Sequence, residues 1–265
     1  MPINDAALNP NGASLDALIA LDASAEACSA SLLYQGQIVS RSSDEPRAHA
    51  KALLPMVDSI LTEAGISLNQ LDGLAFTAGP GSFTGLRIAT SVIQGLAYGS
   101  GLPAYAVTSL QALAIETLRN SGDWQSLTEP CLVIPVFDAR MKELYWSAEL
   151  WNGTVLESVQ SASLSSIDEA RVSIAKIIAE NRGLNIVGVG HAWSQYDIDQ
   201  SGLNAFDASS VPQAESVVIG LSSQALTPTV FQRPQDIEPL YLRNEVTWKK
   251  RTRIRSADES IRITE

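Results

Sequence analysis

From Leu18 onward the chain alternates apolar and polar positions in the way that is typical of β-strands. The pattern predicts a strand that ends at Asp22, a strand over Cys28–Tyr34, a tight turn at Gln35-Gly36, and a third strand after the turn. These elements form an antiparallel meander, and an acidic residue lies at the end of its first strand.

Helical periodicity follows. Apolar residues recur every three or four positions over 47–64, which predicts a helix, although Pro55 should bend it or mark a later start. Beyond it the pattern predicts a strand at 73–78, a glycine-rich loop, a helix at 84–98, a strand at 104–107 and a helix from Ser109.

The second half repeats this arrangement. A strand ending in Asp138, an alternating strand at 143–150, a turn at Asn152-Gly153 and a third strand precede a helix at 167–180, a strand at 185–189 and a helix at 213–226. The repeat predicts a duplicated α/β unit, with chance similarity of two hairpins as the alternative.

Two facing units, each with an acidic strand end, resemble the layout of the actin, sugar kinase and Hsp70 (ASKHA) superfamily. The fold class expected is therefore α/β, with two actin-like (ribonuclease H-like) domains in tandem. The expected boundaries are a flexible extension at 1–14, a first domain at 15–115, a second domain at 116–248 and a basic tail at 249–265.

Charge and composition narrow the function. The 265 residues carry a net charge of −11, which argues against a free-standing nucleic-acid binder, so any RNA would be held mainly by a partner. The run KKRTRIR at 249–255 is interpreted as a solvated tail.

Cys28 and Cys131 lie in apolar runs, which indicates a reducing compartment. No apolar run reaches about eighteen residues and no secretion signal begins the chain, so a cytoplasmic protein without a membrane segment is expected.

The segment AFTAGPGSFTGLR, at 75–87, contains the glycine-rich loop. It matches neither the Walker phosphate loop nor the dinucleotide fingerprint. Backbone N–H groups near Ser82 and Thr84 could hold an anion at the helix start, with Arg87 one turn further on. The alternative is a strand-to-helix turn in which Gly79 and Gly81 adopt positive φ and a hydroxyl caps the helix.

The helix after the loop carries glycine on one stripe. Each interior glycine costs a helix about 1 kcal/mol relative to alanine, so close approach of another helix is expected to offset that cost. The apolar stripe of the helix at 47–64 either packs against the glycine-bearing helix or faces outward beside it. The positions on these two stripes are Gly85, Ile88, Val92, Gly95 and Gly99, with Leu53, Val57 and Leu61.

Candidate catalytic chemistry is sparse. His49 and His191 lack a second histidine four residues on, which excludes a helical zinc pair. Asp22 and Asp138 could hold a magnesium–nucleotide complex, as in a sugar-kinase type phosphotransferase, or could cap turns. A Ser-His-Asp set cannot be assembled. Neither a catalytic residue nor a metal or cofactor is expected.

Four segments together carry a family resemblance: LDASAEACSASL, AGPGSFTGLRIATSVIQGLAYG, VFDARMKELYW and PLYLRNEVTWKK. From about residue 18 to residue 250 the chain resembles the TsaB family, also called YeaZ. The resemblance implies a non-catalytic accessory subunit in the formation of N6-threonylcarbamoyladenosine (t6A) at position 37 of tRNAs that read codons beginning with A.

The resemblance also implies partners. The catalytic relative TsaD carries a metal-binding H-x-x-x-H where this chain has Ser109 and Leu113, and leucine has no donor atom for a metal. That departure also argues against a metallopeptidase. The glycine-bearing helix and the helix at 47–64 are implied to form a helical bundle with TsaD, and to join homodimers when TsaD is absent. TsaE, an ATPase, is a further implied partner, and tRNA is implied to bind through the complex.

Overall fold

The structure, a computed structural model, describes residues 15–45, 48–120 and 129–243. The predicted extension at 1–14 and basic tail at 249–265 lie outside these ranges. The first half of the described chain contains β1 (Ala17–Asp22), β2 (Cys28–Tyr34), β3 (Gln37–Ser43), α1 (His49–Ala64), the 3-10 helix η1 (Leu68–Gln70), β4 (Gly73–Gly79), α2 (Phe83–Ser100), β5 (Ala104–Thr108) and α3 (Ser109–Asn120). The second half contains β6 (Cys131–Arg140), β7 (Glu143–Trp151), β8 (Leu156–Ser166), α4 (Ile167–Glu180), β9 (Asn185–Val189), α5 (Ala192–Gln195), β10 (Ala205–Asp207), α6 (Ala214–Ser222), β11 (Thr229–Phe231) and the 3-10 helix η3 (Pro234–Asp236).

The two halves repeat one topology. The first sheet has the strand order β11-β5-β4-β1-β2-β3 and the second has β10-β9-β6-β7-β8, so five strands of each follow the same path. In both sheets the first three strands are antiparallel neighbours and the fourth runs parallel to the first. This order confirms the duplication and the tandem actin-like fold class, and chance similarity of two hairpins does not explain it.

Asp22 and Asp138 lie near the ends of corresponding first strands. β1 ends at Asp22, whereas β6 continues past Asp138 to Arg140, so the predicted end of that strand is corrected by two residues. The β2–β3 turn is the predicted one, because Gln35 and Gly36 have φ of 51° and 73°, as a two-residue hairpin turn requires. The helix predicted at 47–64 runs without a break through Pro55, which lies on its exposed side.

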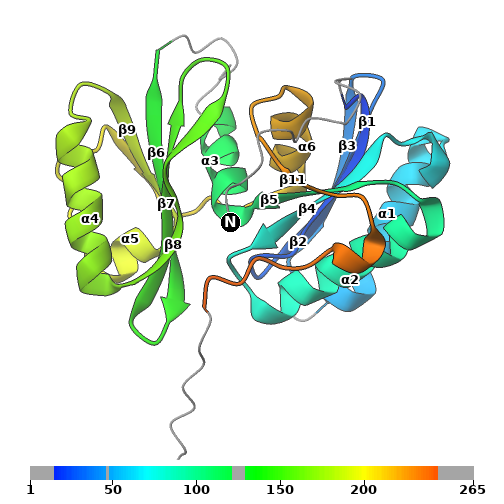
Figure 1. Cartoon of the computed structure of the whole chain (residues 1–265), viewed down its shortest axis with the longest axis horizontal. Helices are drawn as coiled ribbons and strands as arrows, with labels where there is room; N and C mark the ends of the chain where they lie inside the picture. Colours follow the sequence, from blue (N-terminus) through cyan, green and yellow to red (C-terminus); the bar gives the residue numbers. More distant parts are fainter. Residues whose placement is uncertain (1–14, 46–47, 121–128, 244–265) are drawn as a thin grey trace, which may run out of the picture.

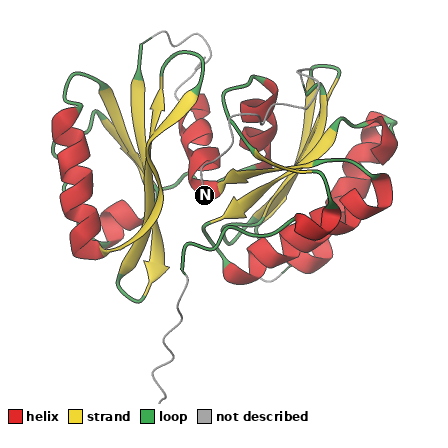
Figure 2. Ribbon diagram, in the orientation of Figure 1, coloured by secondary structure: helices red, strands yellow, loops and turns green. Residues whose placement is uncertain are grey.

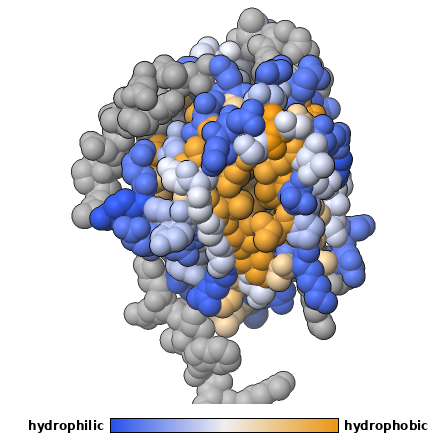
Figure 3. Space-filling view, turned by 90° about the vertical axis from the view of Figure 1, so that its right-hand side faces the viewer, coloured by the Kyte–Doolittle hydropathy of each residue, from blue (hydrophilic) through white to orange (hydrophobic). Residues whose placement is uncertain are grey.

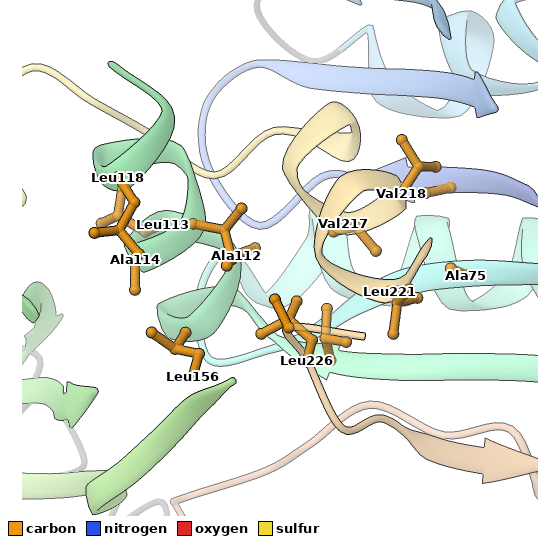
Figure 4. Packing of buried hydrophobic residues seen from close by; sticks show 14 of the residues in the cluster. Ala75, Ala112, Leu113, Ala114, Leu118, Leu156, Val217, Val218, Leu221 and Leu226 are labelled. Carbon is orange, nitrogen blue, oxygen red and sulfur yellow. The ribbon is translucent and has the colours of Figure 1, made fainter. Parts of the chain in front are cut away.

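The layers alternate. α1 and α2 cover the outer face of the first sheet, α4 and α5 cover the outer face of the second, and α3 and α6 lie between the sheets (Figures 1 and 2). Figure 4 shows this middle layer, in which Leu113 of α3 and Leu221 of α6 belong to one buried cluster with Ala75 of β4 and Leu156 of β8. Both sheets therefore share one core through these two helices.

The end of the chain returns to the first sheet. α6 packs between the sheets, and β11 pairs antiparallel with β5. The predicted boundary between residues 115 and 116 falls within α3, and β11, which comes after that boundary in the sequence, is a strand of the first sheet. The helix predicted at 213–226 ends at Ser222.

Candidate functional site

The glycine-rich loop packs against the backbone that follows β1. Ser82 N donates a 2.8 Å hydrogen bond to the carbonyl oxygen of Ser24, and the Ser82 hydroxyl caps α2 by accepting from Gly85 N at 3.3 Å. A side chain at Gly81 would collide with the Ser24 carbonyl oxygen, and one at Gly85 with that of Ala23. Two carbonyl oxygens therefore face the start of α2, where an anion would need N–H donors.

Asp22 is buried beneath this loop. Its Oδ1 accepts hydrogen bonds from the hydroxyls of Thr77, at 2.5 Å, and of Ser24, at 2.7 Å. Burial raises the pKa of the carboxyl to about 6, and these hydrogen bonds offset part of that effect. The carboxylate is thus held by side chains of its own domain and is 1 % exposed.

Asp138 has different surroundings. It accepts a 2.8 Å hydrogen bond from the Tyr196 hydroxyl and a 2.7 Å bond from Arg140 N, and it is half-buried. Within the ranges described, the hydrogen bonds of Asp22 and Asp138 have no partner in common. The same ranges contain no group of three acidic, histidine or cysteine side chains that could hold a metal ion.

Arg87, the predicted anion contact one turn into α2, faces the C-terminal part of the chain. Its guanidinium lies 3.7 Å from the centre of the Phe83 ring, and its Nε donates a 3.0 Å hydrogen bond to the Tyr241 hydroxyl. Thr84 is exposed, and among the described residues no side-chain hydrogen bond joins it to the loop. Ser82, Thr84 and Arg87 therefore do not converge on one point of the described structure.

Ser109 and Leu113 lie in the first turns of α3 and are fully buried. The Ser109 hydroxyl has no hydrogen-bond partner within the described ranges. Leu113 belongs to the core between the sheets (Figure 4). An apolar core position and one hydroxyl do not make a transition-metal site.

The predicted partner positions on α1 and α2 divide into two groups. Leu53, Val57 and Gly85 are buried inside the domain, so their contribution is to the core and to the close contact with Ala23. The remaining predicted positions are accessible to a partner. Leu61, Ile88 and Val92 are partly buried, whereas Gly95 and Gly99 are exposed and have open space where a Cβ would be.

An exposed apolar patch lies on the side of the molecule formed by α1 and α2. The face of the molecule that bears α1 and α2 shows a contiguous orange area in Figure 3. Leu54 on α1 is 53% exposed and Tyr98 on α2 is 83% exposed, which is unusual for such large apolar side chains. We call the exposed and partly buried positions of the two helices the α1–α2 face; they are Leu54, Leu61, Ile88, Val92, Gly95, Tyr98 and Gly99.

Comparison with known proteins identifies the family. A family model described as "TsaD: tRNA N6-adenosine threonylcarbamoyltransferase" matches residues 43–211. The "tRNA threonylcarbamoyladenosine biosynthesis protein TsaB" of Haemophilus influenzae is 37% identical over 240 residues, which are 88% of this chain and 96% of that protein. The chain belongs to the TsaB family.

Further relatives support the same family assignment. The protein of the same name from Escherichia coli is 32% identical over 88% of this chain and 97% of its own length. The solved structure of YeaZ from Pseudomonas aeruginosa superposes with a TM-score of 0.68 at 33% identity, covering 86% of this chain and all of that one. As a further observation on this TsaB-family chain, none of its described helices is long and apolar enough to cross a membrane.

Sequence reasoning missed several residues around these sites. Thr77, which donates to Asp22, lay inside an apolar strand pattern with no polar periodicity to mark it. Tyr241 and Arg243 came from a segment with weak secondary-structure signal, although both belong to the Y-L-R motif of the TsaB resemblance.

Proposed function

We propose that this chain is a cytoplasmic, non-catalytic accessory subunit that is needed to form t6A at position 37 of tRNAs reading codons that begin with A. The match to this chain covers nearly the whole length of the relatives that are named as t6A biosynthesis proteins, which supports a role in the same modification. In this role it binds and activates a TsaD-type catalytic subunit, together with the ATPase TsaE, and tRNA is held by the assembled complex.

The surroundings of Asp22 and the glycine-rich loop, and the residues at 109 and 113, support a non-catalytic role. The Asp22 carboxylate is occupied by Thr77 and Ser24, and carbonyl oxygens cover the loop side of α2. Ser109 and Leu113 stand where the resemblance puts the metal ligands of TsaD. These features argue against a phosphotransferase and against a metallopeptidase.

The observation that carries the proposal is the α1–α2 face. Exposed apolar patches of this kind are usually covered by a partner, and Gly95 and Gly99 leave room for a second helix to approach the backbone of α2 closely. TsaD is the proposed occupant in the complex. In isolation a second copy of this chain is the proposed occupant, since a symmetric pair presents the same face twice.

Reconstitution tests the proposal. TsaD, TsaE, tRNA and a source of threonylcarbamoyl adenylate are incubated with and without this chain, and t6A is measured by mass spectrometry of the digested tRNA. We expect modification only when the chain is present, and no modification by the chain without TsaD. Equal modification in its absence, or t6A formed by this chain alone, would overturn the accessory role.

A further inference from the structure

The guanidinium of Arg87, at the start of α2, is held by two aromatic residues. It lies 3.7 Å from the centre of the Phe83 ring, one turn earlier on the helix, and 5.8 Å from the centre of the Tyr241 ring. Its Nε donates a 3.0 Å hydrogen bond to the Tyr241 hydroxyl. Stacking on one ring and a hydrogen bond to the other fix the orientation of a side chain that is otherwise flexible. We call these three residues the Arg87 cluster.

Tyr241 belongs to the C-terminal segment, residues 237–243, which is fixed on both sides of the tyrosine. Leu240 N donates a 2.8 Å hydrogen bond to the Ala78 carbonyl oxygen, and Arg243 donates to the Ala139 carbonyl oxygen at 3.1 Å. Figure 1 shows this segment, in orange, leaving η3 beside α2 and running toward the second unit. The Tyr241 ring is therefore a fixed wall of the cluster, and Arg87 keeps its orientation before any partner arrives.

The outer edge of this guanidinium is free to bind a ligand. Arg87 is exposed, and within the described ranges no ion pair or hydrogen bond involves its two terminal nitrogens. Glu238, an exposed acid of the same C-terminal segment, does not pair with it. The terminal N–H groups of arginine lie in one plane and match the two oxygens of a carboxylate or a phosphate. A guanidinium fixed in advance loses less entropy when it binds such an anion.

The charge balance favours one carboxylate over a chain of phosphates. Arg87 is the one charged residue of α2, in a protein whose net charge is −11. A nucleic acid is held by several cations that neutralise several phosphates, whereas a carboxylate side chain requires one. Phe83 is 60% exposed and Tyr241 is 47% exposed beside the arginine. Aromatic residues and arginine are enriched at the centres of protein interfaces, so the cluster fits a protein partner that presents Asp or Glu.

The Arg87 cluster lies beside the α1–α2 face. The side chain of Gln94 donates a 3.0 Å hydrogen bond to the Pro234 carbonyl oxygen, which places η3 against α2. α2 therefore has α1 on one side and the C-terminal part of the chain on the other (Figure 1). A partner that covers the α1–α2 face and extends past α2 reaches the cluster. The apolar face supplies buried area, and the arginine supplies a directional contact that fixes how the partner sits.

We propose that the Arg87 cluster binds a carboxylate side chain of the TsaD-type catalytic subunit when that subunit covers the α1–α2 face. The two terminal nitrogens of Arg87 donate parallel hydrogen bonds to the carboxylate oxygens, and the Phe83 and Tyr241 rings shield the pair from water. The identity of the partner rests on the proposed function. The cluster adds the chemical group that this partner must present, and it makes Arg87 a residue that selects the partner.

Selection follows because an apolar face alone is open to any complementary helix, including that of a second copy of this chain. The arginine favours a partner that places an acid at this point, and it penalises one that covers the guanidinium without pairing it. α2 contains no acidic residue, and α1 contains Asp58 and Glu63, of which Glu63 pairs with Arg41. Asp58, exposed on α1, is therefore the acid of these helices through which a second copy would compete for the site.

Isothermal titration of TsaD with the full-length chain tests the proposal. The parent is compared with Arg87→Gln, with Arg87→Lys, which keeps the charge and loses the planar pair of donors, and with Tyr241→Phe, which keeps the ring and loses the hydrogen bond. The matched control is Lys51→Gln, because Lys51 is an exposed cation of α1 that has no ion pair within the described ranges. Sedimentation equilibrium gives the homodimer constants of the same proteins and of Asp58→Asn, after circular dichroism has confirmed folding.

We expect Arg87→Gln to weaken TsaD binding about 10- to 100-fold, as truncation of one partner of a covered charge pair does. Arg87→Lys should lose about tenfold, because an ammonium does not replace the planar donors. Tyr241→Phe should lose about threefold, because the guanidinium is no longer oriented in advance. Lys51→Gln should bind like the parent, and the homodimer should be affected less by Arg87→Gln than the TsaD complex is.

Three results would overturn the proposal. In the first, Arg87→Gln binds TsaD as tightly as Lys51→Gln does. In the second, Arg87→Lys keeps the parent affinity, so that a point charge suffices and the oriented donors have no role. In the third, Arg87→Gln and Asp58→Asn weaken the homodimer equally and by more than Arg87→Gln weakens the TsaD complex, which assigns the site to a second copy.

The titration also separates this inference from the proposed function. A parent chain that binds TsaD and supports t6A formation, with Arg87→Gln equal to it in both, overturns the carboxylate site alone. A parent chain that does not bind TsaD overturns the accessory role and the carboxylate site together.

Discussion

Thr77 donates a 2.5 Å hydrogen bond from its hydroxyl to Oδ1 of Asp22, which joins the ends of β4 and β1 inside the protein. Ser24 donates to the same oxygen at 2.7 Å, and no cation forms an ion pair with this carboxylate in the described ranges. A buried carboxylate held by neutral hydroxyls keeps part of its desolvation cost, so its protonation is linked to folding.

Replacing Asp22 by asparagine should change the pH dependence of stability. The carboxyl has a pKa of about 6 in the folded chain against an ordinary value of 3.8, so the folded state holds an extra proton between these values. Stability contributed by this group is therefore lowest above pH 6 and rises as the pH falls toward 4. At pH 7 the Asp22→Asn variant should be more stable than the parent by up to about 3 kcal/mol, and the advantage should vanish near pH 4.

Urea denaturation of both proteins between pH 4 and pH 8 measures this difference. The Asp58→Asn substitution, at an exposed position of α1, controls for the loss of one negative charge. A gap between parent and Asp22→Asn that stays constant across the range would show that Asp22 titrates normally in the folded protein.

Gly85 and Gly95 should respond in opposite ways to alanine, although both lie in α2. A methyl group at Gly85 would collide with the Ala23 carbonyl oxygen, so Gly85→Ala should destabilise the chain by about 3 kcal/mol. At Gly95 nothing lies within 4 Å of an added Cβ, and alanine favours the helix, so Gly95→Ala should stabilise by up to about 1 kcal/mol. Thermal unfolding measures both, and a Gly85→Ala protein as stable as the parent would contradict the close contact between the loop and residue 23.

Arg243 should restrain the β6–β7 hairpin. Its side chain is 18% exposed and contacts Glu143, the Ala139 carbonyl oxygen and the Met141 sulfur. Arg243→Gln should cost about 1–2 kcal/mol and speed amide hydrogen exchange in the hairpin. Arg233→Gln is the control, because Arg233 forms an exposed pair with Asp236 within one short turn and its loss should cost little. Equal exchange of the hairpin in the two variants would show that the C-terminal segment does not hold it.

The sequence predicts the repeated unit well, because its signals are local. Alternating strands around Gln35-Gly36 and Asn152-Gly153, and the helical stripe of α1, are readable without knowing what they pack against. β10 and β11 escape prediction because each has three residues and depends on a partner strand supplied from elsewhere in the chain.

The role of the glycine-rich loop could be assigned only from the structure. Residues 79–85 are compatible with an anion site or with a packing turn, and the sequence does not indicate that the carbonyl oxygens of Ala23 and Ser24 return to cover the start of α2. The same limit applies to Leu53 and Val57, whose periodicity marks an apolar stripe but not whether the sheet or a partner covers it.

Substitution of Gly95 by arginine tests the α1–α2 face directly. Gly95 is exposed and has open space around it, so a long side chain leaves the fold intact while it blocks close approach of a second helix. Gly95→Arg should weaken binding to TsaD by about 2 kcal/mol or more if the position is central to the interface. It should weaken a homodimer further, because a symmetric pair contains the substitution twice. Val172→Arg is the matched control, since Val172 is 71% exposed on α4, on the opposite side of the molecule (Figure 1). Sedimentation of the free variants and titration against TsaD, after circular dichroism confirms folding, measure both effects. A folded Gly95→Arg protein that binds TsaD as tightly as the Val172→Arg control would move the partner interface away from these two helices.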